Sequence, residues 1–402
     1  MILRKSENVK MKSLDEKLNA MKVRLQNGKA KIMILGLGSV GSYLLDYLVS
    51  MQSENMEIYV AGRDPNKLTM NVNIVRIAAA IRGQCRSEIK IISDVDFNDV
   101  AQLTDCIGSV KPDIIVNSSR AYSGLKYGSI SWSNVRAYGI WSPLSIKYVK
   151  NIMEAYEKAK SDAIVINTSY SDAIIPWLKS AGKAYPDFGS GNVNHLVPRI
   201  KYAAAELSNI KDFWNIDVTY ATAHFHDVVI SKEGHTENVD QLISLKYDGK
   251  KLDVDMNEVF SRCKIAMPVD AKRNMMNASS NFEIVSAILG AVTEGKKYKL
   301  HCPGVFGEIG GYPVVIDGGG ENIKAYIDQS EFSLPEMRAK NRESIYLDGV
   351  EDVTDGTLIY TDELLQKVRK AFGVELVKKV PFDRIDEVAR TIISEIIEKF
   401  RG

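Results

Sequence analysis

The sequence has few cysteines, no long apolar stretch and no excess of charge of either sign. Its 402 residues include four cysteines, which are scattered singly without the paired spacing that a zinc site or a redox dithiol needs. No segment approaches the roughly 20 apolar residues that span a bilayer. The first residues are polar and basic, so the apolar stretch of a secretory signal is missing. We therefore expect reduced thiols and a cytoplasmic protein.

The charge balance also argues against polyanionic partners. Lys and Arg total 52 and Asp and Glu total 51, which gives a formal net charge of +1. Such a chain has no global field that would recruit nucleic acid or an anionic membrane, so we expect a small-molecule partner. Hydrophobic residues make up 45% and charged residues 26%, which is typical of globular proteins. At this length, two domains of α/β type are the natural expectation.

The pattern of apolar runs and amphipathic segments predicts that the chain has three parts. Residues 1–29 form a helical extension, because apolar side chains recur there at spacings of three and four. This extension packs either on a partner subunit or on its own domain. Residues 30–168 form a Rossmann-type, doubly wound parallel sheet. Residues 169–402 form an α+β substrate domain with an extended tail, which builds either a subunit interface or part of a pocket.

Residues 117–143 are rich in Ser, Gly, Tyr and Trp and predict a long loop between two strands. Loops of this length in compact domains are usually lids or binding loops. Arg120 and Arg136 could then close over a substrate, or each could be a solvated charge. The aromatic residues of this segment suit either a bulky substrate or a packed loop, and they are Trp132, Tyr138 and Trp141.

A glycine-rich turn follows the first predicted strand. Residues 31–41 read KIMILGLGSVG, so Gly36, Gly38 and Gly41 have the G-x-G-x-x-G spacing between a strand and a helix. Ser39 and Val40 open that helix, whose unpaired N–H groups and positive dipole end attract phosphate. The motif predicts a bound nicotinamide dinucleotide.

The end of the second predicted strand bears on the choice of dinucleotide. An NAD site commonly places a carboxylate at this point to accept hydrogen bonds from the ribose, whereas a 2′-phosphate requires a cation. Here Gly62 is followed by Arg63, whose guanidinium can hold a phosphate through two hydrogen bonds. Asp64 could still bind a ribose. We predict NADP, with NAD as the alternative.

Several later motifs, taken in order, resemble the lactate and malate dehydrogenase superfamily over residues 31–323. The motifs are VNSSR at 116–120, VINTS at 165–169, GSGN at 189–192, RIKY at 199–202 and ATAHFHD at 221–227. The resemblance implies a Rossmann-fold oxidoreductase that forms a homo-oligomer and has a carboxylate-bearing substrate.

The resemblance also implies roles for individual residues. Ser118 would line the cofactor site, and Asn167 would touch both nicotinamide and substrate. Arg199 would grip the substrate carboxylate, unless it is an ordinary helix cation, and Ser279 would face the substrate. Leu196 stands where the family has the Asp that partners its catalytic His, so the sequence departs from the family at that position.

His224 and His226 compete for the role of proton donor and acceptor. Imidazole suits this role because its pKa lies near working pH. Two histidines at this spacing share one face of an extended segment. The alternatives are that one is structural and the other lies on the surface, or that both bind a metal ion. We favour His224 and assign no metal.

These observations predict an NAD(P)-dependent oxidoreductase that reduces a 2-oxo acid or oxidises a 2-hydroxy acid by hydride transfer. Two alternatives remain open. One is an NAD-dependent, metal-assisted enzyme of the same fold that processes sugars. The other is an NADP-binding regulator without turnover.

Overall fold

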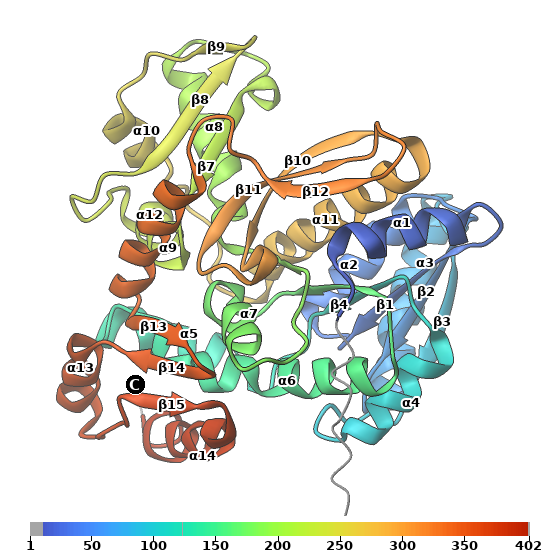
Figure 1. The fold of residues 1–402 in the computed structure, drawn as a ribbon, viewed down its shortest axis with the longest axis horizontal. Coiled ribbons are helices and arrows are strands. Elements are labelled where there is room, and N and C mark those ends of the chain that lie inside the picture. The colour runs from blue at the N-terminus through green and yellow to red at the C-terminus, as the bar shows by residue number, and fades with distance from the viewer. Residues whose placement is uncertain (1–10, 123, 401–402) are drawn as a thin grey trace, which may run out of the picture.

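A computed structural model describes residues 11–122 and 124–400 of the chain. In Figure 1 the parallel sheet and its helices occupy the right side, and three small antiparallel sheets lie toward the top, the centre and the lower left. Residues 1–10 of the predicted N-terminal extension, and Arg401 at the predicted end of the last helix, lie outside the described residues. No helix in the described part of the chain is long and apolar enough to cross a membrane.

Six parallel strands form the central sheet, in the order β3-β2-β1-β4-β5-β6. Their bounds are β1 Ala30–Leu35, β2 Met56–Ala61, β3 Glu88–Ile92, β4 Ile114–Asn117, β5 Ile164–Asn167 and β6 Phe188–Gly189. Leu35 pairs with Ala61 on one side and with Asn117 on the other, so the carboxyl ends of β1, β2 and β4 lie level at one edge. The doubly wound parallel sheet expected from the sequence is confirmed. It continues past residue 168 through β6, and the division into domains stays a prediction.

Side chains of β1 alternate between two separate cores, as a strand that is covered on both faces requires. Met33 and Leu35 pack in one core with α4 and α6, whereas Ile32 and Ile34 pack in the other with α2 and α3. The bounds of these helices are α2 Ser39–Ser50, α3 Pro65–Ile81, α4 Val100–Val110 and α6 Ser142–Lys158.

Helix α1 (Leu14–Leu25) packs on its own chain, which decides between the two placements left open by its sequence. Ser13 and Glu16 form a capping box at its start. Leu18 and Met21 are fully buried, and the helix contacts α11 (Asn274–Glu294) and β12 (Lys324–Ile327).

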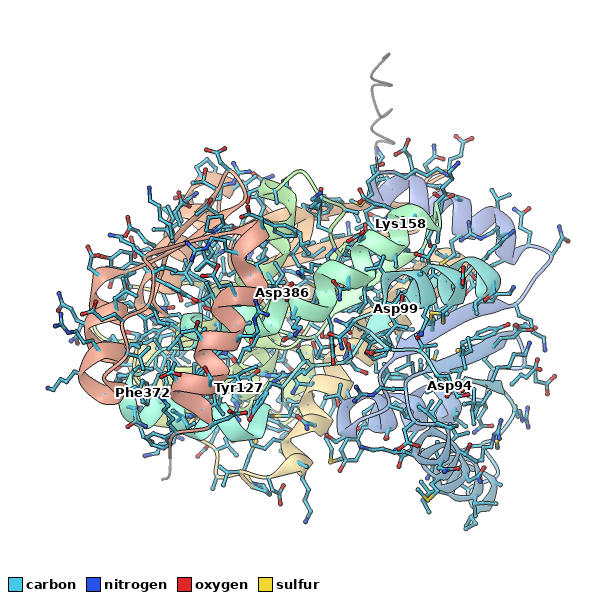
Figure 2. The ribbon with its side chains drawn as sticks, turned by 90° about the horizontal axis from the view of Figure 1, so that it is seen from below. Asp94, Asp99, Tyr127, Lys158, Phe372 and Asp386 are labelled. Atoms are coloured by element: carbon cyan, nitrogen blue, oxygen red, sulfur yellow. The ribbon has the colours of Figure 1, made fainter. Side chains whose placement is uncertain are left out.

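The remaining elements form three antiparallel sheets and the helices between them. The strands are β7 Asp217–Ala221, β8 Leu242–Tyr247, β9 Lys250–Lys251, β10 Lys297–Pro303, β11 Gly311–Asp317, β13 Val350–Thr354, β14 Thr357–Tyr360 and β15 Lys379–Pro381. The helices are α7 Ser171–Ser180, α8 Val197–Leu207, α9 His224–Glu233, α10 Met256–Arg262, α12 Leu334–Leu347, α13 Asp362–Phe372 and α14 Ile385–Thr391, which continues as a π-helix over Ile392–Ile397. Helix α14 lies beside α6, where Lys150 and Asp386 form an ion pair (Figure 2).

Two predictions of local structure are wrong. The predicted loop at 117–143 contains helix α5 (Gly124–Asn134), because Tyr127 and Ile130 lie three residues apart and are both buried in the core. The segment with His224 and His226 is the first turn of α9 rather than extended chain. Residues two apart on a helix point in different directions, so the two imidazoles do not share a face.

Candidate active site

A cavity of about 730 Å³ opens at the carboxyl ends of β1, β2 and β4. This volume lies within the range of ligand pockets, and the carboxyl edge of a parallel sheet is the usual binding position in such folds. Six of the predicted cofactor residues line the cavity, namely Gly36, Gly38, Ser39, Val40, Arg63 and Ser118, whereas Gly41 and Asn167 do not. The structure therefore brings together residues that the sequence places far apart.

The glycine turn has the form that a dinucleotide needs. Gly36 has a φ of +91°, which favours glycine, and its carbonyl oxygen accepts a hydrogen bond from Ser118 Oγ at 2.6 Å. A Cβ on Gly38 would meet no protein atom within 4 Å and would instead occupy the open cradle. Asn274 Nδ2 donates to Ser39 Oγ at 2.6 Å and joins α11 to the turn. These residues fit the pyrophosphate of a nicotinamide dinucleotide.

The Gly41→Ala variant should bind cofactor at least tenfold more weakly, because its Cβ would lie 2.3 Å from the Gly36 carbonyl oxygen and would force the turn to move. A shift of this kind costs more than the roughly 1.4 kcal/mol that corresponds to tenfold in affinity. Fluorescence titration with NADPH measures the change. Gly108→Ala is the matched control, because its Cβ would approach only Ala159, at 3.9 Å. Unchanged affinity in Gly41→Ala would show that the turn does not hold the cofactor.

The end of β2 presents cations to the cavity. Asp64 caps helix α3 through Oδ1, which accepts from the backbone N–H of Lys67 at 3.0 Å, and the residue also lines the cavity. Arg63 is exposed and lines the cavity together with Lys67 and Arg120. Sequence reasoning found Arg63 and Arg120 but missed Lys67, which lies one helical turn after Asp64.

His224 forms the centre of a buried polar cluster next to α7. Its Nδ1–H donates to Asp348 Oδ2 at 2.8 Å, and its backbone N–H donates to Asp172 Oδ1 at 3.0 Å. The edges of the Tyr138 and Tyr170 rings lie against the imidazole, with centroids 4.8 and 5.2 Å away. The His224 side chain is 13% exposed, and its Nε2 contacts no polar group in residues 11–122 and 124–400. That nitrogen remains available to a ligand.

Asp348 is the residue of this cluster that sequence reasoning missed. It is fully buried and lies 124 positions after His224, in the turn between α12 and β13. Tyr170 donates its hydroxyl to Oδ2 at 2.8 Å, and the backbone N–H of Tyr138 donates to Oδ1 at 2.7 Å. No motif marks an isolated Asp at this distance, so only the folded chain reveals the pair.

The carboxylates near His224 favour its charged form. Burial opposes a positive charge on this ring, but Asp348, and then Asp172 and Asp227, raise the pKa of His224 above its ordinary value. Burial also raises the pKa of Asp227, to about 6, although His224 and Arg199 oppose this change. Perturbed groups that lie close together are typical of catalytic sites.

His226 is excluded from proton transfer by its surroundings. It is 1% exposed, its Nδ1 lies 2.8 Å from Ser344 Oγ, and its Nε2 lies 3.3 Å from the carbonyl oxygen of Thr236. Burial lowers the pKa of His226 to about 4, so it stays neutral. These contacts and this burial argue against the predicted catalytic role of His226, whose imidazole instead bonds α9 to Ser344 and Thr236.

Asn167 and Ser279 do not face the cavity as the resemblance implied. Asn167 is fully buried, and its amide donates to Ser169 O and Ser171 Oγ and accepts from Asn117, which leaves no N–H for a ligand. Ser279 Oγ donates to Met275 O within its own helix, and the residue lines a separate hollow of about 450 Å³. These two expectations need correction, because hydrogen bonds within the protein already satisfy both side chains.

The predicted carboxylate clamp, Arg199, is largely occupied by protein groups. It is 4% exposed, and its two terminal nitrogens donate to Cys263 O at 2.9 Å and Met267 S at 3.2 Å. Only its Nε lacks a partner. The protein thus occupies two of the five N–H donors of this guanidinium, and Arg199 does not line the cavity, so the expected grip on a substrate carboxylate stays a prediction.

Arg273 is a further residue that sequence reasoning missed, after Lys67 and Asp348. It lines the cavity, and its guanidinium makes no hydrogen bond or ion pair within the described part of the chain. Its charge adds to the effect of burial in lowering the pKa of His195, and it opposes the rise that burial causes in the pKa of Tyr138, so it lies near the groups around His224. A cation without a protein partner between the cavity and His224 is suited to bind an anion.

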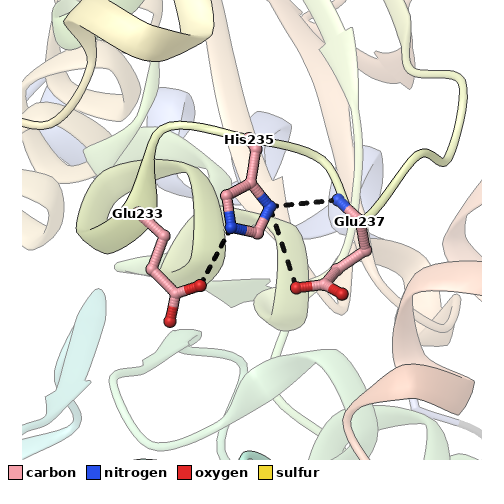
Figure 3. A group of neighbouring side chains, drawn as sticks. All are labelled: Glu233, His235 and Glu237. Atoms are coloured by element: carbon pink, nitrogen blue, oxygen red, sulfur yellow. Dashed lines mark hydrogen bonds and ion pairs between the residues drawn. The ribbon is translucent and has the colours of Figure 1, made fainter.

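A possible metal-binding group lies away from His224, at the end of α9. Glu233, His235 and Glu237 come close enough to share an ion, as Figure 3 shows. Arg136, however, forms ion pairs with both glutamates, and Trp132 Nε1 donates to Glu233 at 2.8 Å. These carboxylates already have cationic partners. Arg136 is thus committed to this cluster rather than free to close over a substrate, which corrects that expectation.

Comparisons with known proteins rest on structure alone, because no protein-family model and no curated protein matches the sequence. The malate dehydrogenase of Cryptosporidium parvum is 16% identical, with 80% of this chain and 98% of that chain covered and a TM-score of 0.50. A lactate dehydrogenase of the same organism was solved with lactic acid and β-nicotinamide adenine dinucleotide. It is 14% identical, with 80% of this chain and 97% of that chain covered and a TM-score of 0.51. The malate dehydrogenase of Aeropyrum pernix is 16% identical, with coverage of 79% and 97% and a TM-score of 0.51. Together with the sheet order and the glycine turn, these similarities show that the chain has the fold of the lactate and malate dehydrogenases, in divergent form.

Proposed function

We propose that this protein is an NADP-dependent oxidoreductase that interconverts a 2-oxo acid and a 2-hydroxy acid. The observation that carries the proposal is His224, whose Nδ1 is held by a buried carboxylate and whose Nε2 is free. A general acid needs a proton at a free position, and the neighbouring carboxylates, which raise the pKa of His224, favour the form that carries a proton on Nε2. This favours a working enzyme over a regulator without turnover.

The glycine turn and His224, which belongs to the buried polar cluster and not to the cavity lining, have separate roles in the proposed reaction. Gly36 and Gly38, with Gly41 behind them, would hold the pyrophosphate against the start of α2, and Ser118 keeps the turn in shape. Bound NADPH supplies the hydride that reduces the carbonyl carbon. His224 donates the proton from Nε2 to the carbonyl oxygen, and it recovers that proton in the reverse direction.

The substrate carboxylate is assigned to Arg273. Its guanidinium has no protein partner, whereas Arg199 spends two of its three nitrogens on Cys263 and Met267. Buried side-chain atoms without partners occur around the same place, which supports a polar ligand that completes their hydrogen bonds. They include His195 Nε2, Arg199 Nε and Asp227 Oδ1.

The preference for NADP rests on the end of β2. Arg63 and Lys67 line the cavity beside Asp64, whose Oδ1 caps α3. Two cations beside one carboxylate that already accepts a hydrogen bond suit a 2′-phosphate better than a bare ribose. The homo-oligomer expected from the sequence also remains a proposal. It is supported by exposed apolar side chains along α3, namely Met70, Ile74, Ile77 and Ile81.

The first test is fluorescence titration of cofactor-stripped protein with NADPH and NADH, followed by a screen of 2-oxo acids for oxidation of NADPH. Tight binding of either cofactor with turnover of at least one acid supports the proposed reaction. A protein that binds neither cofactor would be no oxidoreductase of this kind.

The Arg63→Ala variant should bind NADPH about tenfold or more weakly and NADH with unchanged affinity, because a guanidinium bound to phosphate contributes more than 1 kcal/mol. The same titration measures both affinities. Arg86→Ala removes an exposed arginine that does not line the cavity and serves as the control. An equal loss for both cofactors, or none, would contradict the assignment of Arg63 to the 2′-phosphate.

A further inference from the structure

Asp348 is held in place by groups from three distant segments. Its carboxylate accepts hydrogen bonds from His224 on α9, from Tyr170 before α7 and from the backbone of Tyr138. Its own carbonyl oxygen accepts from the backbone N–H of Gly139 at 2.8 Å. The next residue, Gly349, has a φ of +91°, and a Cβ there would lie 2.5 Å from Leu364 Cδ2. The turn that presents Asp348 is therefore fixed in both shape and position.

We propose that Asp348 is the positioning residue for His224, so that the C-terminal segment from Ser333 to Phe400 is a component of the active site. This inference rests on the proposed function and assigns the tail a role that the sequence left open. The resemblance in the sequence ends near residue 323, and Asp348 lies beyond it. At the position where that family has its Asp, this chain has the buried apolar residue Leu196.

A carboxylate on Nδ1 determines what the other nitrogen can do. Because a carboxylate can only accept, it keeps a proton on Nδ1 and fixes the orientation of the ring. Nε2 then carries the proton that is transferred, and it becomes the acceptor in the reverse direction. The remaining charged and titratable groups that surround the imidazole come from several elements and stay in the chain when Asp348 is replaced. They are Asp172, Asp227, His195, Arg273, Tyr138 and Tyr170.

The tail is built into the protein around this contact and does not lie over it as a loose flap. Tyr360, which is fully buried, donates its hydroxyl to Ile140 O at 3.1 Å, and Trp177 Nε1 donates to Gly356 O at 3.0 Å. Side chains of α12, α13, α14 and β14 share one core with α6 and α7. The carboxylate is therefore delivered by a packed segment.

The experiment compares wild type, Asp348→Asn and Asp352→Asn. Asp352 belongs to the same segment but forms an exposed ion pair with Arg342, so it is the matched control. In Asp348→Asn, reduction of a 2-oxo acid should slow at least tenfold, within the usual range for general acid catalysis. NADPH affinity should stay within about twofold, a change of less than 0.5 kcal/mol. Asp352→Asn should match wild type in both measurements.

A second measurement does not depend on turnover. Proton NMR titration of the histidine ring protons follows His224 directly. Because Asp348 raises the pKa of His224, the Asp348→Asn variant should titrate at lower pH than wild type. Tyr170→Phe should move the titration to higher pH, because the Asp348 carboxylate then no longer shares its charge with the tyrosine hydroxyl. This variant keeps the test available if Asp348→Asn does not fold.

The outcomes separate this inference from the proposed function. Unchanged His224 titration in both variants, or full reductase activity in a folded Asp348→Asn protein, would overturn the role of Asp348. A wild-type protein that reduces no 2-oxo acid would end the proposed function, while the titration still decides whether Asp348 holds His224.

Discussion

Replacement of His224 by asparagine lowers the rate of 2-oxo acid reduction by about 100-fold or more and leaves NADPH binding unchanged. The expected size follows from the usual contribution of general acid catalysis, about 10²- to 10⁴-fold. Asparagine can still donate to Asp348, but it has no proton that titrates near working pH. Steady-state assays give kcat, and fluorescence titration gives the cofactor affinity. His235→Asn is the control, since this histidine is exposed and lies in the Glu233 cluster.

The pH dependence provides an additional check on His224. Reduction requires the protonated imidazole and oxidation requires the neutral one. Because the pKa of His224 is raised by Asp348, reduction should persist to a higher pH than an ordinary histidine would allow. Oxidation of the hydroxy acid should require a correspondingly higher pH. Full activity in His224→Asn, with a pH profile like that of wild type, would assign proton transfer to another group.

Lys17→Met should lower the free energy of unfolding by about 3–5 kcal/mol, the usual result of removing one partner from a buried ion pair. Lys17 Nζ lies 2.8 Å from Asp187 Oδ2, and the two side chains are 0% and 3% exposed. The substitution leaves the Asp187 carboxylate buried without its cation. Urea denaturation at pH 7 measures the loss. Lys12→Met is the control, because its pair with Asp162 is exposed and contributes at most about 1 kcal/mol.

The sign of the pH dependence follows from Lys17 itself. Burial opposes its charge, but Asp187 and Tyr156 raise the pKa of Lys17 above its ordinary value. The stabilisation is therefore fully present below the pKa of an unfolded lysine, about 10.4. It is lost as the pH rises through the folded pKa. The difference between wild type and Lys17→Met should be constant from pH 7 to 9 and should shrink only at strongly alkaline pH. A loss below about 1 kcal/mol at pH 7 would show that this pair stabilises no better than a surface pair.

The cofactor part of the site could be predicted because its chemistry is local. The residues of the glycine turn lie within six positions of one another, and the Gly36 carbonyl beneath Gly41 restricts the turn locally. The parallel strands could also be predicted, because a strand covered on both faces is a continuous apolar run. Helix α5 was missed since its buried residues are separated by serines and glycines.

The sequence predicted only some residues of the proposed proton-transfer site. His224 was found from its motif, but the choice between it and His226 depended on what each imidazole contacts. Asp348 and Arg273 were missed because these two residues lie 124 and 49 positions away from His224 along the chain. Arg199 was found by its position after the glycine-serine turn, yet its guanidinium contacts Cys263 and Met267 instead of the cavity.

The sequence by itself determined the alternation of strands and helices, the phosphate-binding turn and the absence of an excess charge, because each depends on residue type and short spacing. Only the tertiary structure decided which histidine is free, which carboxylate holds it and which arginine has no partner. These properties depend on burial and on hydrogen bonds between distant segments. Whether a buried polar group has a hydrogen-bond partner depends on the chain segment that packs against it. The fold as a whole determines which segment that is.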